Sequence, residues 1–375
     1  MSVQPVRILG VIDEDPFHFA TWSGISYYFF TALKNAGYLC QAISATPPLS
    51  LQYLYKLLSF HPCMSQWRFK YHINTSYYHR MTRTALNRLS LLPNSGYNVI
   101  LQVGAWYDLT QAKGKPVVSY HDGNLARLLH SPYGYPPVRD KYIARALTYE
   151  RQLYSRLDHI FPMSRWLADS FMKDFGVPHA KLTPVGAGVN LPYVRPIVNK
   201  SYENPNILFV GKDFTRKGGK YLLEAFSIVR RELPNATLTI IGPKLAFVPD
   251  GVRCLGPLSK ASRTGMDRLL DEYSSASLFV MPSLYEPFGV VFAEAMAHKL
   301  PCIGTDICAI PEIIEDGITG YVVPPEDSQS LSGRMISLLK NPDKCRTFGD
   351  KGHAKYLTEF TWDRVTHKIA AQIRI

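Results

Sequence analysis

The sequence predicts an α/β protein with two Rossmann-like doubly wound domains whose parallel sheets face each other across a cleft. The 375 residues are too many for one ordinary hydrophobic core. Two successive series of short apolar runs alternate with longer amphipathic runs, which indicates strands followed by helices. A polar, proline-bearing stretch at 191–205 separates the two series. We therefore expect an N-terminal domain at 1–190, this linker, and a C-terminal domain at 206–360.

The first series contains four apolar runs that we expect to be strands, at 6–12, 98–103, 116–120 and 159–163. Helices are expected within 18–37, over 139–157 and over 164–175, where Ser164 is a suitable N-cap. Residues 39–95 are harder to assign. Apolar residues recur there at helical spacing over 51–58, and an aromatic and basic tract follows.

The second series predicts strands at 206–210, 237–241, 252–255, 278–281 and 321–325. Helices are expected at 221–233, 267–276 and 290–298, from 327 or 328 onward, and from Thr361. Pro301 prevents the helix at 290–298 from continuing. Each strand is thus followed by a loop and a helix, as in a parallel sheet.

The stretch 278–317 combines a buried strand, a turn and the start of a helix. A helix start presents unpaired backbone N–H groups and the positive end of a dipole, so it can hold a diphosphate. Gly289 would let a ligand approach that backbone closely. Glu286 and Glu294 each offer two carboxylate oxygens side by side, which suits the vicinal hydroxyls of a sugar. A nucleotide sugar would satisfy all of these groups.

The string EPFGVVFAE, from Glu286 to Glu294, resembles the donor-site signature of family 4 glycosyltransferases, which are retaining enzymes of the GT-B fold. The resemblance implies transfer of a sugar from a nucleotide diphosphate sugar to a hydroxyl acceptor, in glycan, glycolipid or cell-surface polysaccharide synthesis. It implies that Glu286 faces the transferred sugar and that Glu294 binds the ribose. The backbone of four residues would hold sugar hydroxyls and phosphate: Phe288, Gly289, Val290 and Val291.

The loop 211–219 resembles the family's Gly-Arg and Lys-Gly loop, whose cations hold the donor diphosphate. Lys217 matches the lysine, and Gly211 opens the loop. Lys212 stands at the usual place of the arginine, while Arg216 offers a guanidinium close by, so both stay candidates. Arginine alone could bind as a rigid bidentate fork. The resemblance also implies that the backbone at two further strand ends holds the nucleobase, at Gly242, Pro257 and Leu258.

Two residues of the first series complete the candidate site. Gly24 lies in a loop that resembles the family's loop after the first strand, where donor phosphate and acceptor approach the backbone. His121 follows a strand of a parallel sheet directly, at the edge where ligands bind, and it resembles a family histidine beside the transferred sugar. The resemblance further implies that the last helix, 361–375, crosses back onto the N-terminal domain.

The resemblance implies a reaction without a dedicated nucleophile, in which the departing phosphate oxygen helps to deprotonate the acceptor. Cations and a helix N-terminus would stabilise that phosphate, so we expect neither a cofactor nor a metal. Asp13 and Asp15 nevertheless match a short D-x-D metal motif, which is the competing hypothesis. Three more functions stay open: a GT-B phosphorylase, a sugar-nucleotide epimerase, and a donor-binding protein without turnover. A nucleic-acid partner is not expected, since no recognition module is present.

The net charge of +12 is concentrated in the first half of the chain, where residues 1–190 account for +9. No acidic residue occurs between Asp15 and Asp108. Such a field attracts phosphate, an anionic membrane surface or an acidic polymer. The aromatic and basic tract within 39–95 could therefore contact a membrane, stack on an acceptor sugar, or only pack on the core. The acceptor itself could be a glycan, a lipid-linked molecule or a small molecule.

Neither a long apolar run nor a signal-like N-terminus is found in the sequence, so we expect a cytoplasmic protein, with peripheral contact at the inner face of the membrane as an option. The six cysteines are scattered without a Cys-x-x-Cys pair. A reducing compartment with buried thiols is therefore expected, rather than a zinc site or a disulfide framework.

Overall fold

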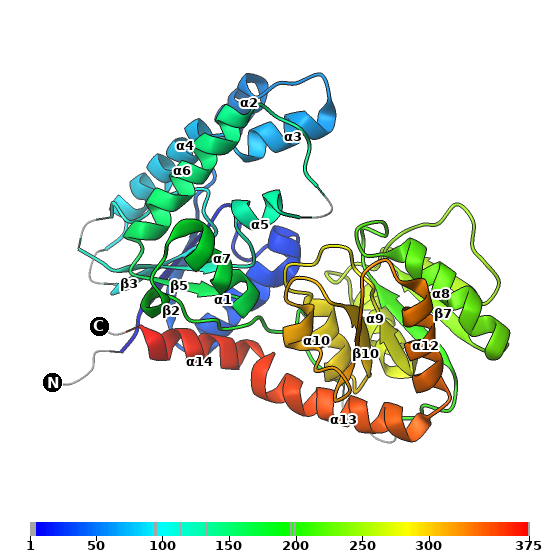
Figure 1. Ribbon diagram of the computed structural model, residues 1–375. Coiled ribbons are helices and arrows are strands. Elements are labelled where there is room, and N and C mark those ends of the chain that lie inside the picture. The colour runs from blue at the N-terminus through cyan, green and yellow to red at the C-terminus, as the bar shows by residue number, and fades with distance from the viewer. Residues whose placement is uncertain are drawn as a thin grey trace. The chain divides into compact units, whose positions relative to one another are not determined.

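The computed structural model describes residues 5–93, 96–112, 114–131, 134–195, 197 and 200–373. The chain divides into two compact units, Met1–Gly186 with Trp362–Ile375, and Ala187–Thr361 (Figure 1). The stretch 191–205, predicted as a linker, falls within the second unit. Residues 196 and 198–199 of that stretch, and 374–375 of the predicted last helix, lie outside the described residues.

The first unit contains a parallel sheet of five strands in the order β2-β1-β3-β4-β5. Its strands are β1 (Ile8–Ile12), β2 (Leu39–Ser44), β3 (Val99–Val103), β4 (Val117–His121) and β5 (His159–Pro162). The side chains of β1, β3 and β4 are all buried, which explains their continuous apolar runs. β2 was not predicted because it is an edge strand that is partly exposed along its whole length.

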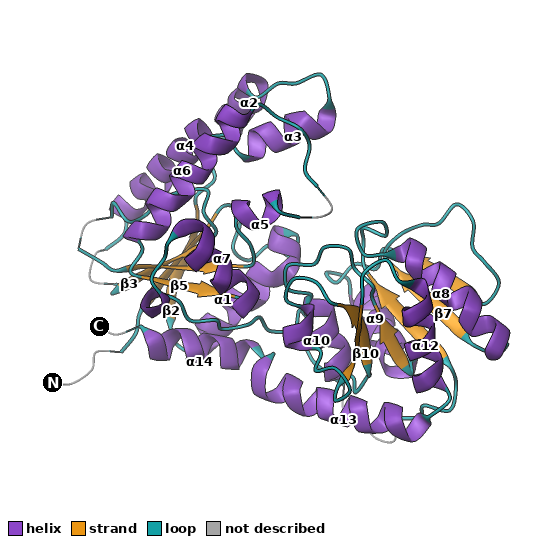
Figure 2. Cartoon of the chain, in the orientation of Figure 1, coloured by secondary structure: helices purple, strands orange, loops and turns teal. Residues whose placement is uncertain are grey.

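Helices pack around this sheet, as Figure 2 shows. The helices of the first unit are α1 (Ile25–Asn35), α2 (Leu49–Leu58), α3 (Met64–His72), α4 (Thr75–Ser90), α5 (Leu125–Leu129), α6 (Asp140–Arg156), α7 (Arg165–Phe175) and α14 (Trp362–Gln372), with short 3-10 turns η1 (Thr21–Gly24) and η2 (His179–Lys181). Ser164 caps α7 by accepting a hydrogen bond from the Leu167 amide at 3.1 Å, as predicted. The last helix, α14, packs on α1, where the rings of Phe29 and Trp362 lie 5.6 Å apart.

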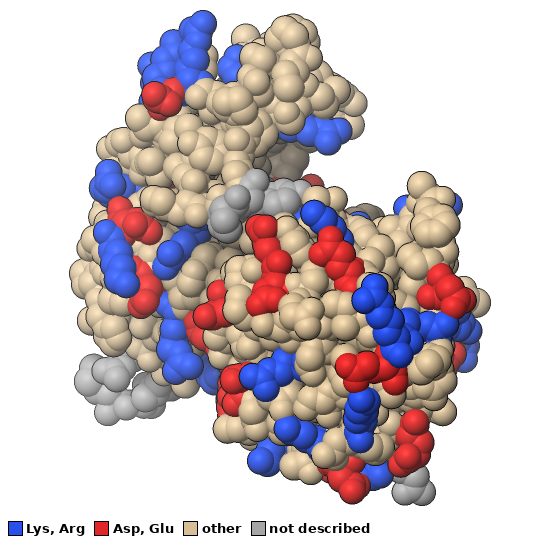
Figure 3. Space-filling view, turned by 45° about the vertical axis from the view of Figure 1, so that its right-hand side comes forward, with Lys and Arg blue, Asp and Glu red and all other residues tan. Residues whose placement is uncertain are grey.

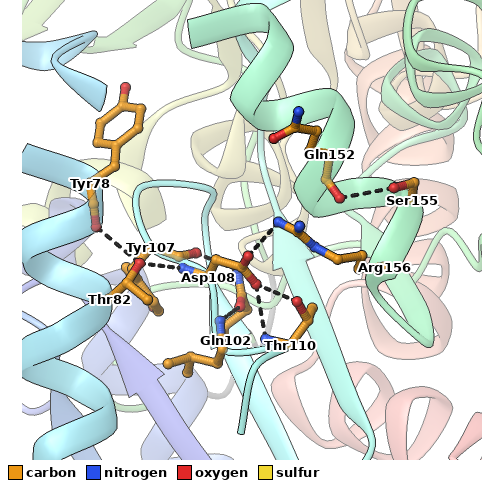
Figure 4. Close-up of polar contacts among 10 residues, drawn as sticks. Tyr78, Thr82, Gln102, Tyr107, Asp108, Thr110, Gln152, Ser155 and Arg156 are labelled. Carbon is orange, nitrogen blue, oxygen red and sulfur yellow. Dashed lines mark hydrogen bonds and ion pairs between the residues drawn. The ribbon is translucent and has the colours of Figure 1, made fainter. Parts of the chain in front are cut away.

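A buried carboxylate, Asp108, ties α4 and α6 to the loop after β3 (Figure 4). Its side chain accepts hydrogen bonds from the backbone and hydroxyl of Thr110 and forms an ion pair with Arg156 of α6 at 2.5 Å. The Asp108 amide donates to the hydroxyl of Thr82 in α4, at 2.9 Å. These partners offset the cost of burying the charge, and they fix both helices against the sheet.

The second unit contains a parallel sheet of six strands in the order β11-β10-β9-β6-β7-β8. The strands are β6 (Asn206–Val210), β7 (Thr237–Ile241), β8 (Val252–Gly256), β9 (Leu278–Val280), β10 (Cys302–Thr305) and β11 (Gly320–Val323). The helices are α8 (Gly219–Glu232), α9 (Arg263–Ser275), α10 (Val290–Ala297), α11 (Ile310–Ile313), α12 (Ser328–Leu339) and α13 (Pro342–Glu359). Two doubly wound parallel sheets were predicted, and both are present.

The strand order of the second unit reverses between β6 and β9. The chain moves outward from β6 through β7 to β8, and then returns to place β9 on the other side of β6. Parallel sheets bind their ligands outside the carboxyl ends of the strands at such a reversal. A ligand site is therefore expected at the loops that follow β6 and β9.

Within the described residues, no helix has both the length and the apolar character that crossing a membrane would require.

Candidate active site

Two loops meet at the reversal of the second sheet, residues 211–218 after β6 and residues 281–289 after β9. The amide of Leu284 donates to the carbonyl of Arg216 at 2.8 Å and joins the two loops directly. Gly218 is required at this junction, because a Cβ there would lie 1.7 Å from the carbonyl oxygen of Pro282. The loops thus approach too closely for any residue with a side chain at that position.

An ion pair links these loops at the centre of the candidate site. The Nζ atom of Lys217 lies 2.6 Å from Oε2 of Glu286 and also donates to Sδ of Met281 at 3.3 Å. The side chains of Lys217 and Glu286 are only 11% and 13% exposed. The aliphatic part of Lys217 runs over Gly211, where a Cβ would come within 2.2 Å of its Cδ. The glycine that opens the loop therefore makes room for the lysine.

A second cation, Arg216, lies beside the same carboxylate. Its Nη1 atom donates to the carbonyl of Tyr285 at 2.6 Å and lies 3.4 Å from Oε2 of Glu286. Lys212, the other candidate of the sequence, is exposed, and no contact with Glu286 is found for it among the described residues. The structure thus brings Arg216 and Lys217 together at Glu286 and leaves Lys212 at the loop surface.

The N-terminus of α10 follows directly after Glu286. Gly289 precedes the helix in the left-handed conformation, with φ of 92°, and no side chain caps the first turn. Val290 and Val291 begin the helix and are partly exposed, while Phe288 is buried. Backbone N–H groups of this first turn, together with the helix dipole, provide an anion-binding end beside the two cations.

Glu294, which the resemblance assigns to the ribose, is fully buried within the second unit. Lys260 forms an ion pair with its Oε1 atom, and the hydroxyl of Tyr273 donates to Oε2 at 3.0 Å. Lys260 also donates to the carbonyl of Asn190 at 3.2 Å. The ribose contact stays a prediction, and it requires that Lys260 share or leave the carboxylate.

Lys260 is a residue that the sequence did not assign to the site. It lies in the loop after β8, next to the segment predicted to hold the nucleobase. The expected backbone positions Gly242, Pro257 and Leu258 follow the adjacent strands β7 and β8, and the Gly242 amide donates to the Gly256 carbonyl at 2.9 Å. Nothing in the sequence around Lys260 indicates that this loop residue contacts a glutamate of α10.

In the first unit, Gly24 lies where the predicted phosphate loop should be. Trp22, Ser23 and Gly24 all have positive φ, at 48°, 56° and 91°, and Gly24 directly precedes α1. The indole of Trp22 donates to the carboxylate of Asp122 at 2.7 Å. Trp22 and Asp122 are further residues that the sequence did not assign to this region.

His121 is the last residue of β4, as predicted, but its ring does not face an open surface. The residue is only 2% exposed, and its Nε2 atom lies 2.8 Å from the hydroxyl of Ser119. The rings of Tyr154 and Phe171 lie 5.6 and 5.3 Å from it, on α6 and α7. Burial lowers the pKa of His121 to about 3, so the ring is neutral at ordinary pH. Its predicted contact with the transferred sugar stays a prediction.

The D-x-D string at Asp13 and Asp15 follows β1. Burial, together with the neighbouring Glu14, raises the pKa of Asp13 to about 7. The described residues contain no cluster of three or more His, Cys, Asp or Glu side chains that could hold a metal ion.

A protein-family model covers the segment that carries these loops. Residues 194–355 match the family model of glycosyl transferases group 1. That segment spans most of the second unit, including both glutamates, both loops and the N-terminus of α10. The predicted resemblance is therefore confirmed for this segment, which matches a family of glycosyltransferases.

Curated relatives match about half of the chain. Alpha-maltose-1-phosphate synthase of Mycolicibacterium smegmatis is 30% identical over 185 residues, which are 44% of this chain and 46% of that protein. D-inositol 3-phosphate glycosyltransferase of Streptomyces bingchenggensis is 27% identical over 239 residues, 57% of this chain and 52% of the relative. The chain spans about half the length of the curated relatives it matches.

Solved structures extend the likeness to nearly the whole chain. Sucrose-phosphate synthase from Thermosynechococcus elongatus has a TM-score of 0.68 and 18% identity, with 97% of this chain and 98% of that chain covered. WaaG, a glycosyltransferase involved in lipopolysaccharide biosynthesis, has a TM-score of 0.64, 15% identity and the same coverage. Anabaena HepE in complex with UDP-glucose has a TM-score of 0.64 and 14% identity, again with 97% and 98% covered. These likenesses confirm the predicted GT-B fold.

Proposed function

We propose that the protein is a retaining glycosyltransferase that moves a sugar from a nucleotide diphosphate sugar to a hydroxyl acceptor without a metal. The observation that carries this proposal is the convergence of Lys217 and Arg216 on Glu286, beside the N-terminus of α10. Two fixed cations and a helix N-terminus form a preorganised site for a leaving diphosphate. The match of residues 194–355 to glycosyl transferases group 1 supports the same reaction class.

The chemistry requires charge stabilisation more than a nucleophile. As the bond between the sugar C1 and the diphosphate oxygen breaks, negative charge grows on the leaving group. Lys217, Arg216 and the first-turn N–H groups of α10 are fixed where they can hold that charge. The acceptor oxygen then bonds to C1 on the same face, and its proton passes to the departing phosphate oxygen. Glu286 orients both cations and offers its carboxylate to the hydroxyls of the transferred sugar.

Two structural neighbours suggest which donors to test first. One Anabaena HepE structure contains UDP and glucose, and another contains UDP-glucose. We therefore infer that a UDP-sugar is the first donor to examine. A glycan, lipid-linked or small-molecule hydroxyl is the acceptor class, and the basic first half of the chain supports an acceptor at or near an anionic surface.

A donor screen tests the proposal. Binding and hydrolysis of UDP-, GDP- and ADP-sugars would be measured in EDTA and in added Mg²⁺ or Mn²⁺. We expect one donor class to bind and turn over in EDTA. Failure of every donor to bind, or turnover only with a divalent ion, would overturn the metal-independent transferase. An absolute need for inorganic phosphate would indicate a phosphorylase instead.

The Lys217→Ala variant, measured in the same screen, tests whether Lys217 stabilises the charge of the leaving group. We expect it to lower kcat by about 10²–10³-fold and to change donor affinity much less, because Lys217 acts mainly on charge that develops during the reaction. Glu232→Gln is the matched control, since Glu232 pairs with Lys340 at an exposed position on α8. A large loss of donor affinity with unchanged kcat would contradict the role given to Lys217.

A further inference from the structure

Helix α2 of the first unit exposes an unusual amount of apolar surface. None of its residues is buried. Seven large apolar side chains on α2, in the turn that follows it and at the start of α3 are between 47% and 68% exposed: Leu49, Tyr53, Leu54, Leu57, Leu58, Phe60 and Met64. We name these seven residues the α2 patch. A cluster of this many exposed apolar side chains indicates an interaction surface.

The helix that carries the patch is held firmly in place. The indole of Trp67 in α3 donates to the carbonyl of Lys56 at 2.7 Å, and its ring lies 5.5 Å from Phe60. The side chain of Asn74 donates to the hydroxyl of Ser59 at 2.9 Å, at the end of α2. Tyr55, on the inner side of α2, lies 5.4 Å from the ring of Tyr77 in α4. The patch is therefore the outer face of an ordered helix pair.

Figure 1 shows α2 and α3 at the end of the first unit that is farthest from its sheet. Beneath them, the Asp108 network joins α4 and α6 to the sheet (Figure 4). The α2 patch thus projects from a well-anchored support.

The charge around the patch has one dominant sign. Lys56, Arg68 and Lys70 lie on the same two helices, and no acidic residue occurs anywhere between Asp15 and Asp108. Figure 3 shows the corresponding end of the molecule as mostly uncharged surface with basic side chains at its margins. The start of α6 adds Asp140 between two further basic residues. Apolar side chains bordered by cations match the interface of an anionic bilayer.

A second copy of the chain fits this surface less well. A two-fold contact through the α2 patch would bring Lys56, Arg68 and Lys70 near their own counterparts. No acidic side chain of α2, α3 or α4 could offset that repulsion, because these helices contain none. An anionic lipid surface supplies the missing negative charge, and its acyl region accepts the leucines.

We propose that the α2 patch docks the protein on an anionic lipid bilayer. The leucines of α2 enter the boundary between headgroups and acyl chains, while Lys56, Arg68 and Lys70 lie against lipid phosphates. This docking does not rest on the proposed transferase activity. It would, however, bring the enzyme to acceptors that are held at the membrane.

Vesicle flotation of the full chain tests the docking. Vesicles of pure phosphatidylcholine would be compared with vesicles that contain phosphatidylglycerol, at low and high salt. We expect binding to the anionic vesicles, weakened by salt, and little binding to the neutral ones. No binding to anionic vesicles at low salt would overturn the proposal.

Two variants and one control separate the parts of the proposal. Leu54→Gln/Leu57→Gln/Leu58→Gln changes three exposed leucines, and we expect it to fold normally and to bind anionic vesicles at least about 10-fold more weakly. Lys56→Gln/Arg68→Gln should remove most of the salt dependence. Leu357→Gln, at a 51% exposed position of α13 in the second unit, should bind like the parent. If the leucine variant bound anionic vesicles as strongly as the parent, docking through the α2 patch would be refuted.

Two further readouts separate membrane docking from dimer formation and from catalysis. Light scattering without vesicles would reveal a dimer, and a dimer that the leucine variant abolishes would identify a second copy as the occupant and overturn the lipid assignment. Donor hydrolysis in solution should be the same in the leucine variant and the parent. A leucine variant that loses vesicle binding but keeps donor hydrolysis would confirm docking separately from catalysis. If neither the parent nor the variants hydrolysed a donor, the proposed transferase activity would be contradicted, but the docking proposal would not.

Discussion

At the scale of single residues, the pair of Lys260 and Glu294 shows how much a buried charge depends on its partner. Glu294 is fully buried, and Lys260 and Tyr273 occupy its two oxygens. Removing the cation leaves a carboxylate that water cannot reach. Breaking a fully buried ion pair costs about 3–5 kcal/mol. Because the Lys260 side chain is 28% exposed, the cost here should be smaller.

We predict that Lys260→Met lowers the free energy of unfolding by about 2 kcal/mol. The measurement is urea unfolding of the parent, Lys260→Met, Glu294→Gln and the double variant. The double variant should regain most of the loss, because it removes the charge together with its partner. Additive losses in the double variant would mean that the two side chains do not interact energetically.

The residues that sequence reasoning identified best are those whose neighbours lie close in the chain. Glu286, Gly289 and the start of α10 belong to one short segment, so a local pattern could reveal them. Lys260 meets Glu294 only through the folded sheet, and no spacing in the sequence indicates that contact. His121 was correctly placed at the end of β4, but the direction of its ring depends on Tyr154 and Phe171, which are distant in sequence.

At the scale of elements, the start of α10 depends on the conformation of Gly289. Its φ of 92° is unfavourable for a residue with a Cβ, and a Cβ there would lie 2.9 Å from the Phe292 ring and 3.3 Å from Cγ of Glu286. We predict that Gly289→Ala lowers the free energy of unfolding by about 1–2 kcal/mol. It should also weaken donor binding, because the added methyl group lies at the helix end proposed to hold the diphosphate.

Gly333→Ala is the matched control for that substitution. Gly333 lies exposed within α12, and nothing is within 4 Å of the position that its Cβ would take. Alanine should therefore stabilise this helix by up to about 1 kcal/mol. Thermal unfolding and donor titration of both variants check the prediction. Unchanged donor affinity in Gly289→Ala would argue that the ligand does not approach this helix end.

Elements with fully buried strands or clear caps could be predicted from the sequence, and those without such signals could not. The runs of β1, β3, β6 and β7 are almost wholly apolar because both faces of these strands are covered. β2 at the sheet edge mixes exposed and half-buried residues and has no such run. The strand β10 is fully buried but was not predicted, because its four residues, Cys302–Thr305, include a glycine and a threonine and so form no continuous apolar run.

At the scale of the whole molecule, the chain passes between its two units twice, so the first unit combines 1–186 with the last helix. No local pattern in the sequence indicates this return, which was expected only from the family resemblance. The reason is physical: α14 has an ordinary amphipathic pattern, and the identity of the surface that it covers is decided by packing. The contact between Phe29 and Trp362 is part of that packing.

Trp362→Ala tests whether α14 stabilises the first unit. Trp362 is 8% exposed and packs against Phe29 of α1, so its truncation should cost about 3 kcal/mol through the lost contact and the cavity. Hydrogen exchange would locate the effect. We expect faster exchange in α1 and β1 of the first unit, and little change in β6 and β7, which belong to the second unit. Leu357→Ala, at an exposed position of α13, should leave both regions unchanged. Faster exchange in β6 and β7 with α1 unaffected would show that the last helix supports the second unit instead.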